Sequence, residues 1–397
     1  MTPGHLSESW FRYFPGSRPD NYRWSAALAL ALGQAHWGAA SLGEVDRVGQ
    51  RLRDRVGDDE AWFAEWRRLG DQVRGLAQEA ERDGHSLTAA GAYLRACCYY
   101  QWGERFRTPK DSEALGVYRT AVECFHRYAA LVDWPHIEVV EVPYQGGSLP
   151  AYLAHTEAEE RGRVPCVVFF DGLDITKELQ YAQGVPELTR RGIACLVVDG
   201  PGNGESIRFR GLPLRYDYEL AGSAAFDYLE THSEIDAQRI AVMGISLGGY
   251  YAPRCAAKEP RFAACVAWGA IWDYHAIWKR RIEAAYNTAL SVPAHHITWV
   301  FQVNTIEEVL QKLEDFRLDG VAQGVRCPFL LLHGERDAQI PVEDSHALFQ
   351  AVGSQDKHLK IFTEEEGGAQ HCQADNTILA ITYLSDWLRE KLQASAP

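Results

Sequence analysis

The first third of the chain repeats its apolar residues at a helical spacing. Residues 87–100 are rich in Ala, Leu, Cys and Tyr and follow Ser86, a plausible N-cap, and residues 117–131 carry one apolar face. Pro135 ends this pattern, so we predict a helical unit over residues 1–135 that caps the rest of the chain or mediates dimerisation. The spacing is clearest where bulky side chains alternate with Arg and Glu, at Trp62, Phe63, Trp66 and Leu69.

From residue 137 onward, short apolar runs replace the helical pattern. Residues 137–142 and 149–155 flank a glycine-containing turn, which is typical of a hairpin. Short strands that are apolar on both sides and alternate with helix-length segments predict a mostly parallel sheet with both faces covered. We therefore predict an α/β domain over residues 136–397. Its further strands are expected at 166–170, 194–198, 240–243, 264–268, 329–332 and 358–362.

One segment interrupts this alternation of strands and helices. About sixty residues separate Trp268 from Phe329, too many for one crossover helix. We predict that residues 270–325 form a helical insertion after the sixth core strand, over the carboxyl edge of the sheet, where ligands bind in such folds. The alternative is an ordinary aromatic core. The side chains that crowd there are Trp272, Tyr274, Trp278, Tyr286, His295, His296, Trp299 and Phe301.

Composition limits the class of protein. A length of 397 residues suggests one large domain and a smaller one. The formal net charge of −14 argues against nucleic acid and anionic membranes as partners. The nine cysteines lack a framework spacing, which is typical of reduced thiols in a cytoplasmic protein. The apolar run 26–32 is too short to cross a membrane and lacks a signal-peptide cleavage site, so we expect a buried helix segment there.

The strongest chemical motif is Gly244-Ile245-Ser246-Leu247-Gly248, a G-x-S-x-G pattern. An apolar strand precedes it and residues 250–258 can be helical after it, so Ser246 falls on a tight strand-to-helix turn. Such a turn lifts the hydroxyl above the sheet, and small neighbours let strand and helix approach. A chance match in a glycine-containing turn would not explain this context. We predict that Ser246 is a nucleophile and that this part of the chain resembles the α/β-hydrolase fold.

The other two members of a catalytic triad follow in the order that this fold uses, acid and then histidine. Asp337 lies in a polar loop after an apolar strand, and His371 lies in a loop after the last strand. The histidine would take the serine proton, and the aspartate would orient the ring and stabilise its charged form. Glu335 competes with Asp337, whereas His333 precedes the acid loop and is excluded by chain order. No metal-ligand spacing supports a metal at the adjacent histidines of the insertion.

Two backbone N–H groups are candidates for an oxyanion hole. Leu247 supplies one, at the positive end of the helix that follows Ser246. The loop after the third strand supplies the other from Leu173 or Gly172, with Asp171 and Asp174 as loop-shaping residues. The glycine-rich run 199–206 lacks the Gly-Lys-Ser/Thr ending of a phosphate loop and is better explained as a structural turn. We expect no cofactor and no metal.

Longer motifs resemble one particular family within the α/β-hydrolase fold. The run from Gly244 to Arg254, with Pro253 early in a helix, the loop 171–174 and the loop 199–204 together resemble the 2,6-dihydroxypseudooxynicotine hydrolase family. That family is similar to fungal polyketide-shortening hydrolases and, more distantly, to fermentation-respiration switch proteins. The resemblance covers essentially the whole chain. It implies hydrolysis of a carbon–carbon bond next to a ketone, in an aryl ketone or a β-dicarbonyl substrate, and a homodimer.

The resemblance also implies a further acidic residue after the nucleophile. Asp273 and Glu283 are the candidates, although Asp273 could equally be a helix N-cap. Tyr250 and Trp272 are expected to contact the substrate. A carboxylesterase or an acyltransferase would need the same triad and stays the main alternative, with a small-molecule ester in place of the ketone. A non-catalytic binding protein would not need the triad.

Overall fold

The computed structural model describes residues 12–156 and 162–393, and its N-terminal part is helical. The side chains of Asp58 and Asp111 cap two of its helices by accepting the N–H of Ala61 and Ala114. Ser86, which was expected to be an N-cap, is instead the first residue of α4. His85 holds the N-cap position and makes no capping hydrogen bond with its side chain. The five helices are α1 Pro19–Gly33, α2 Leu42–Leu52, α3 Asp59–Arg82, α4 Ser86–Glu104 and α5 Ser112–Leu131.

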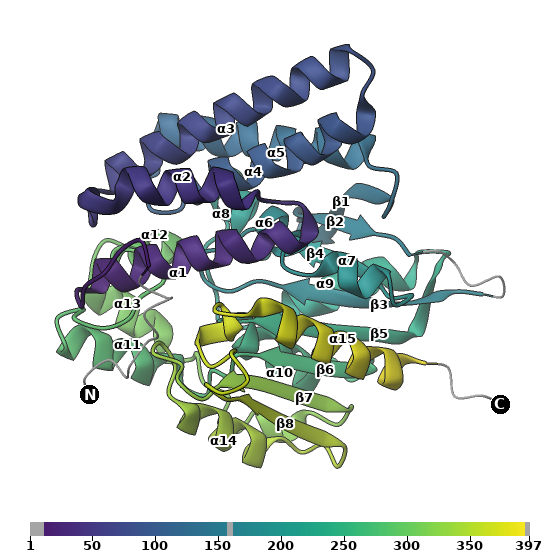
Figure 1. The fold of residues 1–397 in the computed structure, drawn as a ribbon. Coiled ribbons are helices and arrows are strands. Elements are labelled where there is room, and N and C mark those ends of the chain that lie inside the picture. Colours follow the sequence, from purple (N-terminus) through teal and green to yellow (C-terminus); the bar gives the residue numbers. More distant parts are fainter. Residues whose placement is uncertain (1–11, 157–161, 394–397) are drawn as a thin grey trace.

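The predicted helices pack as their apolar spacing suggested. Trp62, Phe63, Trp66 and Leu69 all face the interior of this helical part, where α3 packs on α4 and α4 on α5. The α1 helix instead contacts α2, α4 and the last helix of the chain, α15 (Thr377–Leu392). Figure 1 shows α1 between the other N-terminal helices and α15. The N-terminal helices therefore reach the rest of the molecule through α1 as well as α4.

An eight-stranded sheet forms the rest of the framework, in the order β1-β2-β4-β3-β5-β6-β7-β8. The β1–β2 and β2–β4 pairs are antiparallel and all later pairs are parallel. This is the mostly parallel α/β-hydrolase sheet predicted from the sequence. The strands are β1 Ile137–Tyr144, β2 Gly147–Ala154, β3 Val164–Phe170, β4 Ala194–Val198, β5 Ile235–Ile245, β6 Ala264–Trp268, β7 Phe329–Gly334 and β8 Lys357–Phe362.

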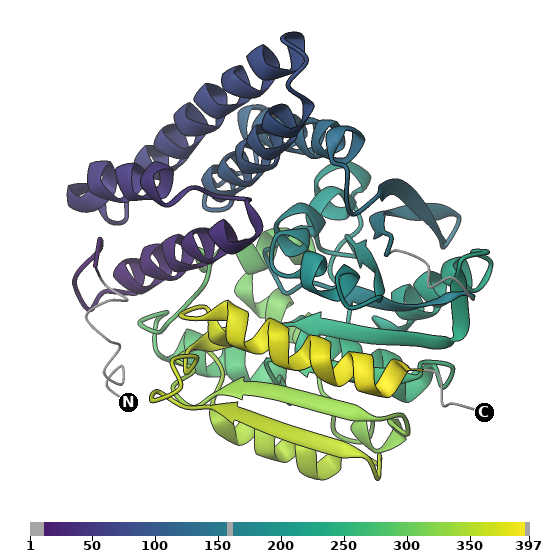
Figure 2. The same cartoon turned by 45° about the vertical axis from the view of Figure 1, so that its right-hand side comes forward.

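Helices cover both faces of the sheet, as strands buried on two sides require. One face carries α9 (Glu219–Glu230), α10 (Gly248–Lys258) and α14 (Val342–Ala351), and the other carries α15 with the short α6 and α7. Figure 2 shows α15, in yellow, lying over the sheet and running roughly along its strands. The remaining short helices are α6 Lys177–Tyr181, α7 Val185–Thr189, α8 Gly204–Arg210, and the 3₁₀ helices Gln34–Trp37, Arg53–Arg55, Ala322–Gly324 and His371–Gln373.

The insertion after β6 forms three helices, α11 Tyr274–Glu283, α12 His296–Phe301 and α13 Ile306–Leu313. A reciprocal capping box between Thr305 and Glu308 starts α13. In Figure 1 these helices lie beside α1, at one end of the sheet. That end is the carboxyl edge, because the pairings Phe170–Gly244 and Ile245–Trp268 align the last residues of neighbouring parallel strands. Ligand-binding loops of such sheets gather at this edge.

Candidate active site

Ser246 lies on the tight turn between β5 and α10. Its φ of 58° is in the left-handed region, which a side-chain-bearing residue adopts only when its surroundings enforce it. The Ser246 N–H donates to the carbonyl of Trp268 on the next strand at 2.8 Å. A Cβ at Gly244 would overlap the carbonyl of Gly248, so the approach of strand and helix depends on this glycine. The structure thus shows the turn geometry that the motif predicts.

The structure brings Ser246, His371 and Asp337 together across 125 and 34 residues of sequence. Ser246 Oγ is 2.8 Å from His371 Nε2, and His371 Nδ1 is 2.7 Å from Asp337 Oδ2. The other carboxylate oxygen of Asp337 accepts the N–H groups of Gln339 at 2.8 Å and Ile340 at 2.9 Å. Backbone donors therefore fix the carboxylate, the carboxylate fixes the imidazole, and the imidazole faces the serine hydroxyl.

Asp337 and His371 shift each other's pKa. Burial opposes charging of the His371 ring, but the Asp337 carboxylate outweighs burial and raises the pKa of His371 well above its ordinary value. Burial also acts on Asp337, where the adjacent His371 outweighs it and lowers the pKa of the carboxyl. The Asp337 side chain is 1% exposed, so the pair is screened little by solvent. The site favours a charged imidazole beside a charged carboxylate.

The competing residues of the acid loop occupy other places. Glu335 is exposed and accepts the Glu364 N–H at 3.2 Å on the surface. His333 is buried behind Asp337, where its Nδ1 lies 3.3 Å from the Ala270 N–H and its Nε2 lies 3.2 Å from the Ile340 carbonyl. His333 therefore holds the loop that carries the acid and does not face Ser246.

The two loops beside Ser246 differ in their free backbone donors. Within the described ranges, the N–H groups of Leu247 and Leu173 donate to no protein acceptor. The Gly172 N–H donates to the side chain of its own neighbour, Asp171. This contact disfavours Gly172 as the oxyanion donor. The glycine allows close approach, because a Cβ there would lie 2.9 Å from the Ser246 Cβ. Leu173 is the remaining candidate of that loop.

Two cavities meet at Ser246 and His371. The first has a volume of about 50 Å³ and its wall is partly polar, with Arg105, Asp171, Asp174, Gln183 and Gln339 beside Tyr22, Ala26 and Leu30 of α1. The second, of about 20 Å³, lies under the insertion and is lined by Leu173, Ile271, Tyr274, Trp278, Leu290 and Val292 together with the polar residues Arg281, Ser291 and Gln339. A ligand bound at Ser246 can thus extend to either side of the serine, toward α1 or toward the insertion.

The four residues expected to contact substrate line neither of the two cavities at Ser246. Asp273 is the N-cap of α11, accepting the Ala276 N–H at 2.8 Å, so the N-cap interpretation is the one the structure shows. Glu283 is exposed at the end of the same helix. Trp272 and Tyr250 line neither cavity, and the Tyr250 hydroxyl donates to the Tyr216 carbonyl at 2.9 Å. Contact of these four residues with the substrate therefore stays a prediction, and the two cavities at Ser246 lend it no support.

The sequence predicted that the N-terminal helices cap the rest of the chain, but it did not identify the residues that they contribute to the site. Arg105 directly follows α4, lines the first cavity, and donates from Nε to Asp174 at 2.6 Å. Tyr22 and Ala26 of α1 line the same cavity. No motif marks these positions, and 141 residues separate Arg105 from Ser246 in the sequence. The available signal was weak: Arg105 is a basic residue a few positions beyond the helix predicted over residues 87–100, and Asp174 is an acidic residue in the loop after β3.

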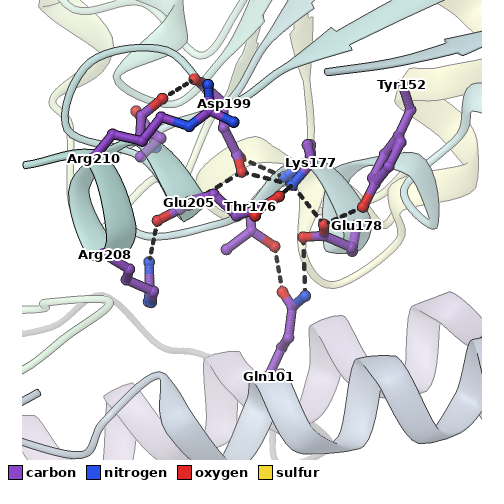
Figure 3. A network of polar contacts seen from close by, with 12 residues as sticks. Gln101, Tyr152, Thr176, Lys177, Glu178, Asp199, Glu205, Arg208 and Arg210 are labelled. Carbon is purple, nitrogen blue, oxygen red and sulfur yellow. Dashed lines mark hydrogen bonds and ion pairs between the residues drawn. The ribbon is translucent and has the colours of Figure 1, made fainter. Parts of the chain in front are cut away.

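A buried ionic network fixes the segment that follows this loop (Figure 3). The Lys177 ammonium lies 2.7 Å from Glu178, 2.9 Å from Asp199 and 2.7 Å from Glu205. Burial lowers and the carboxylates raise the pKa of Lys177, with a net rise above its ordinary value. From α4, Gln101 donates to Glu178 at 3.0 Å and accepts from Thr176. The end of α4 thus holds this segment at Gln101 and at Arg105.

Two groups of side chains in the described part of the chain place three metal-ligand atoms close together. In the first, Glu178, Asp199 and Glu205 already surround the Lys177 ammonium. The second, on the β1–β2 hairpin, is the group His136, Glu138 and His155. Since Ala154 pairs with Cys195 at the start of β4, this group lies at the sheet edge opposite Ser246. Neither group has a geometry that serves chemistry at the serine.

The fold and the relatives of this chain define a serine hydrolase of the α/β-hydrolase class. The prolyl oligopeptidase family matches residues 182–395, just over half of the 397-residue chain. The chain belongs to this family. Among the described residues, none of the helices combines the length and apolar character that crossing a membrane requires.

Similar proteins extend the match over the N-terminal helices. Hydrolase LUC6 of Fusarium sp is 31% identical, covering 90% of this chain and 94% of that protein. The 2,6-dihydropseudooxynicotine hydrolase of Paenarthrobacter nicotinovorans is also 31% identical, covering 90% and 92%. A crystal structure of 2,6-dihydroxy-pseudo-oxynicotine hydrolase superposes with a TM-score of 0.76 at 28% identity, covering 91% and 96%. The resemblance read from the extended serine motif is confirmed.

Proposed function

We propose that Ser246 is the nucleophile, His371 the general base and Asp337 the orienting acid of this hydrolase. The observation that carries the proposal is the continuous chain of contacts from Asp337 through His371 to Ser246, at 2.7 and 2.8 Å. The free N–H groups of Leu247 and Leu173 would stabilise the oxyanion of the tetrahedral state. Their position beside Ser246, one at the start of α10 and one on the adjacent loop, supports this assignment.

We further propose that the scissile bond joins a ketone carbon to a carbon leaving group. Ser246 Oγ attacks the carbonyl carbon while His371 takes the hydroxyl proton. Collapse of the tetrahedral state breaks the carbon–carbon bond, and its electron pair leaves with the departing carbon as an enolate, which His371 protonates. Water, activated by the neutral His371, then attacks the acyl-serine and releases the carboxylic acid with free Ser246.

The family resemblance is what favours carbon–carbon cleavage over ordinary ester hydrolysis in this proposal. The extended motif resembles the 2,6-dihydroxypseudooxynicotine hydrolase family, which implies cleavage next to a ketone. A 20-hydroxy-prefusarin hydrolase of Gibberella moniliformis is 30% identical and covers 90% of this chain. A carbon leaving group needs its negative charge delocalised, and the substrate class we propose is therefore an aryl ketone or a β-dicarbonyl. The ligand would be a small molecule.

The N-terminal unit 1–135 and the insertion 270–325 would close the site. Tyr22 and Ala26 reach the first cavity from one side, and Trp278 reaches the second from the other. Exclusion of water favours return of the proton to the leaving carbon over side reactions. The homodimer and the cytoplasmic location expected from the sequence stay predictions.

Parallel assays of a β-diketone and an ester test this function. The protein is incubated with benzoylacetone and, separately, with phenyl acetate, and the acids released are identified by mass spectrometry. We expect benzoylacetone to give benzoic acid with acetone, or acetic acid with acetophenone. Ester turnover without diketone cleavage would contradict carbon–carbon hydrolysis and indicate an esterase. Full activity of Ser246→Ala on both substrates would contradict the triad itself.

A further inference from the structure

Two polar residues that line the first cavity each contain a buried atom without a hydrogen-bond partner. Arg105 Nη1 and Asp171 Oδ2 are both inaccessible to solvent and make no hydrogen bond within the part of the chain that the structure describes. Both residues line the cavity that also contains Ser246 and His371. Buried polar groups are normally paired, because leaving one unpaired costs its desolvation. Two such residues in the lining of one cavity beside Ser246 are therefore candidates for binding a polar atom of the ligand.

The rest of the Arg105 guanidinium is held in place by other contacts. Its Nε donates to Asp174 at 2.6 Å, and Nη2 pairs with the same carboxylate. The guanidinium also lies 5.1 Å from the ring centre of Trp102 and 5.6 Å from that of Phe106. These contacts leave Nη1 as the one nitrogen without a partner, and the residue is 4% exposed. Arg105 is thus a preorganised cationic donor.

Asp171 can act as a second hydrogen-bond donor if its carboxyl group is neutral. Its Oδ1 accepts the adjacent Gly172 N–H, which leaves Oδ2 free. Burial raises the pKa of Asp171 well above its ordinary value. The Gly172 N–H and Arg105 oppose this rise, while the nearby carboxylates of Asp174 and Asp199 add to it. A carboxyl kept neutral in this way carries a proton on Oδ2 and donates a hydrogen bond, as a carboxylate cannot.

We propose that Arg105 and Asp171 form a second oxygen-binding site, which takes the oxygen on which the enolate leaving group carries its negative charge. This inference rests on the proposed carbon–carbon cleavage and deepens it. The Leu247 and Leu173 N–H groups stabilise the oxyanion of the attacked ketone, whereas Arg105 and Asp171 stabilise the charge that appears on the other side of the breaking bond. Neither residue transfers a proton in this step, since His371 protonates the departing carbon.

The second site selects a substrate class. A β-dicarbonyl offers an oxygen to each set of donors, so both carbonyls are bound while the bond between them breaks. A simple alkyl ketone has no oxygen for Arg105 and Asp171, which would then stay buried and unpaired. Sites built to hydrogen-bond a substrate oxygen reject analogues that lack it for this reason. The substrate therefore carries a second oxygen in a 1,3-relation to the scissile ketone.

Binding to the Ser246→Ala variant tests the second site without requiring turnover. The probes are benzoylacetone and butyrophenone, which share a carbon skeleton and differ in the second carbonyl oxygen. Dissociation constants are measured by isothermal titration calorimetry. Because hydrogen bonds to charged groups are the stronger kind, we expect Ser246→Ala to bind benzoylacetone about 10- to 100-fold more tightly than butyrophenone.

Second substitutions in the Ser246→Ala background assign this preference to residues. Arg105→Gln, which keeps a donor for Asp174 but removes the free nitrogen, should reduce the preference to about twofold or less. Asp171→Ala should do the same, whereas Asp171→Asn should retain most of it, because an amide also donates a hydrogen bond. The matched control is Arg208→Gln, which removes an equally buried guanidinium that pairs with Glu104 outside the cavity. It should keep the full preference.

The outcomes separate this proposal from the function on which it rests. An equal affinity for the two probes, or a preference that survives both Arg105→Gln and Asp171→Ala in folded protein, overturns the second site while leaving the serine hydrolase intact. A loss of preference in Arg208→Gln as large as in Arg105→Gln would show a purely structural effect and also overturn it. Failure of the wild-type protein to cleave any β-diketone would instead contradict the proposed reaction, whatever the affinities.

Discussion

Asp337 and Glu335 are two acidic residues of one loop, but their surroundings differ. Asp337 is fixed by two backbone N–H groups and contacts His371 at 2.7 Å, whereas Glu335 lies on the surface. We predict that Asp337→Asn lowers kcat by about 10⁴-fold, because the imidazole loses the partner that sets its tautomer. The matched variant Glu335→Gln should change kcat by less than about twofold. Steady-state kinetics would contradict the assignment if the two variants lost activity to the same degree.

The raised pKa of His371 predicts an alkaline shift of the pH profile. General-base catalysis needs the neutral imidazole, so activity rises as His371 loses its proton. Because Asp337 holds the pKa above the ordinary value of about 6.5 for histidine, the rising limb of kcat/KM should lie at a higher pH than that value. In Asp337→Asn the limb should move to lower pH. A limb at or below about 6.5 in the wild type, unmoved by Asp337→Asn, would contradict this coupling.

Residues joined by local motifs were predictable, and residues joined only in space were not. Ser246 sits in a motif whose glycines the turn requires, and Asp337 and His371 each follow a strand at a position that the fold sets. Arg105 carries no such mark, because its role depends on how the end of α4 meets the loop after β3. The choice between the Leu173 and Gly172 donors stayed open in the sequence, because sequence alone does not show that the Asp171 side chain accepts the Gly172 N–H.

At the scale of elements, α1 and the insertion restrict access to Ser246. The two cavities beside the serine measure about 50 and 20 Å³, well below the several hundred Å³ of typical ligand pockets. A ketone substrate therefore requires these elements to move or repack around it. The apolar runs of the sequence were sufficient to place the strands, because a strand that is buried on both faces is a continuous run of apolar residues. The packing of α1 against α15 involves no such pattern and could not be predicted.

Filling the α1 side of the first cavity should discriminate substrates by size. Ala26 lines this cavity, and Ala26→Phe should lower kcat/KM for benzoylacetone by about tenfold or more, because the added ring occupies its space. The smaller phenyl acetate should be affected less. Leu32→Phe, on the same helix but outside both cavities at Ser246, serves as the control. Equal losses for both substrates, or an equal effect of the control, would contradict a role of α1 in the site.

At the scale of the whole molecule, the Lys177 network ties the N-terminal helices to the sheet. Lys177→Met would leave buried carboxylates without their cation, and we predict a loss of about 3–5 kcal/mol in the free energy of unfolding. Arg210→Gln breaks a partly exposed pair with Glu141 and should cost less than about 1 kcal/mol. Urea unfolding measures both. A Lys177→Met protein as stable as the Arg210→Gln protein would show that the network contributes little.

Labelling with a fluorophosphonate tests the central claim, that Ser246 is an activated nucleophile, without depending on the choice of substrate. Such a probe phosphonylates a serine only where a base activates it, and digestion followed by mass spectrometry locates the adduct. We expect one labelled peptide, containing Ser246, with labelling abolished in Ser246→Ala and strongly slowed in His371→Ala. Labelling at another residue, or equal labelling of wild type and His371→Ala, would contradict it.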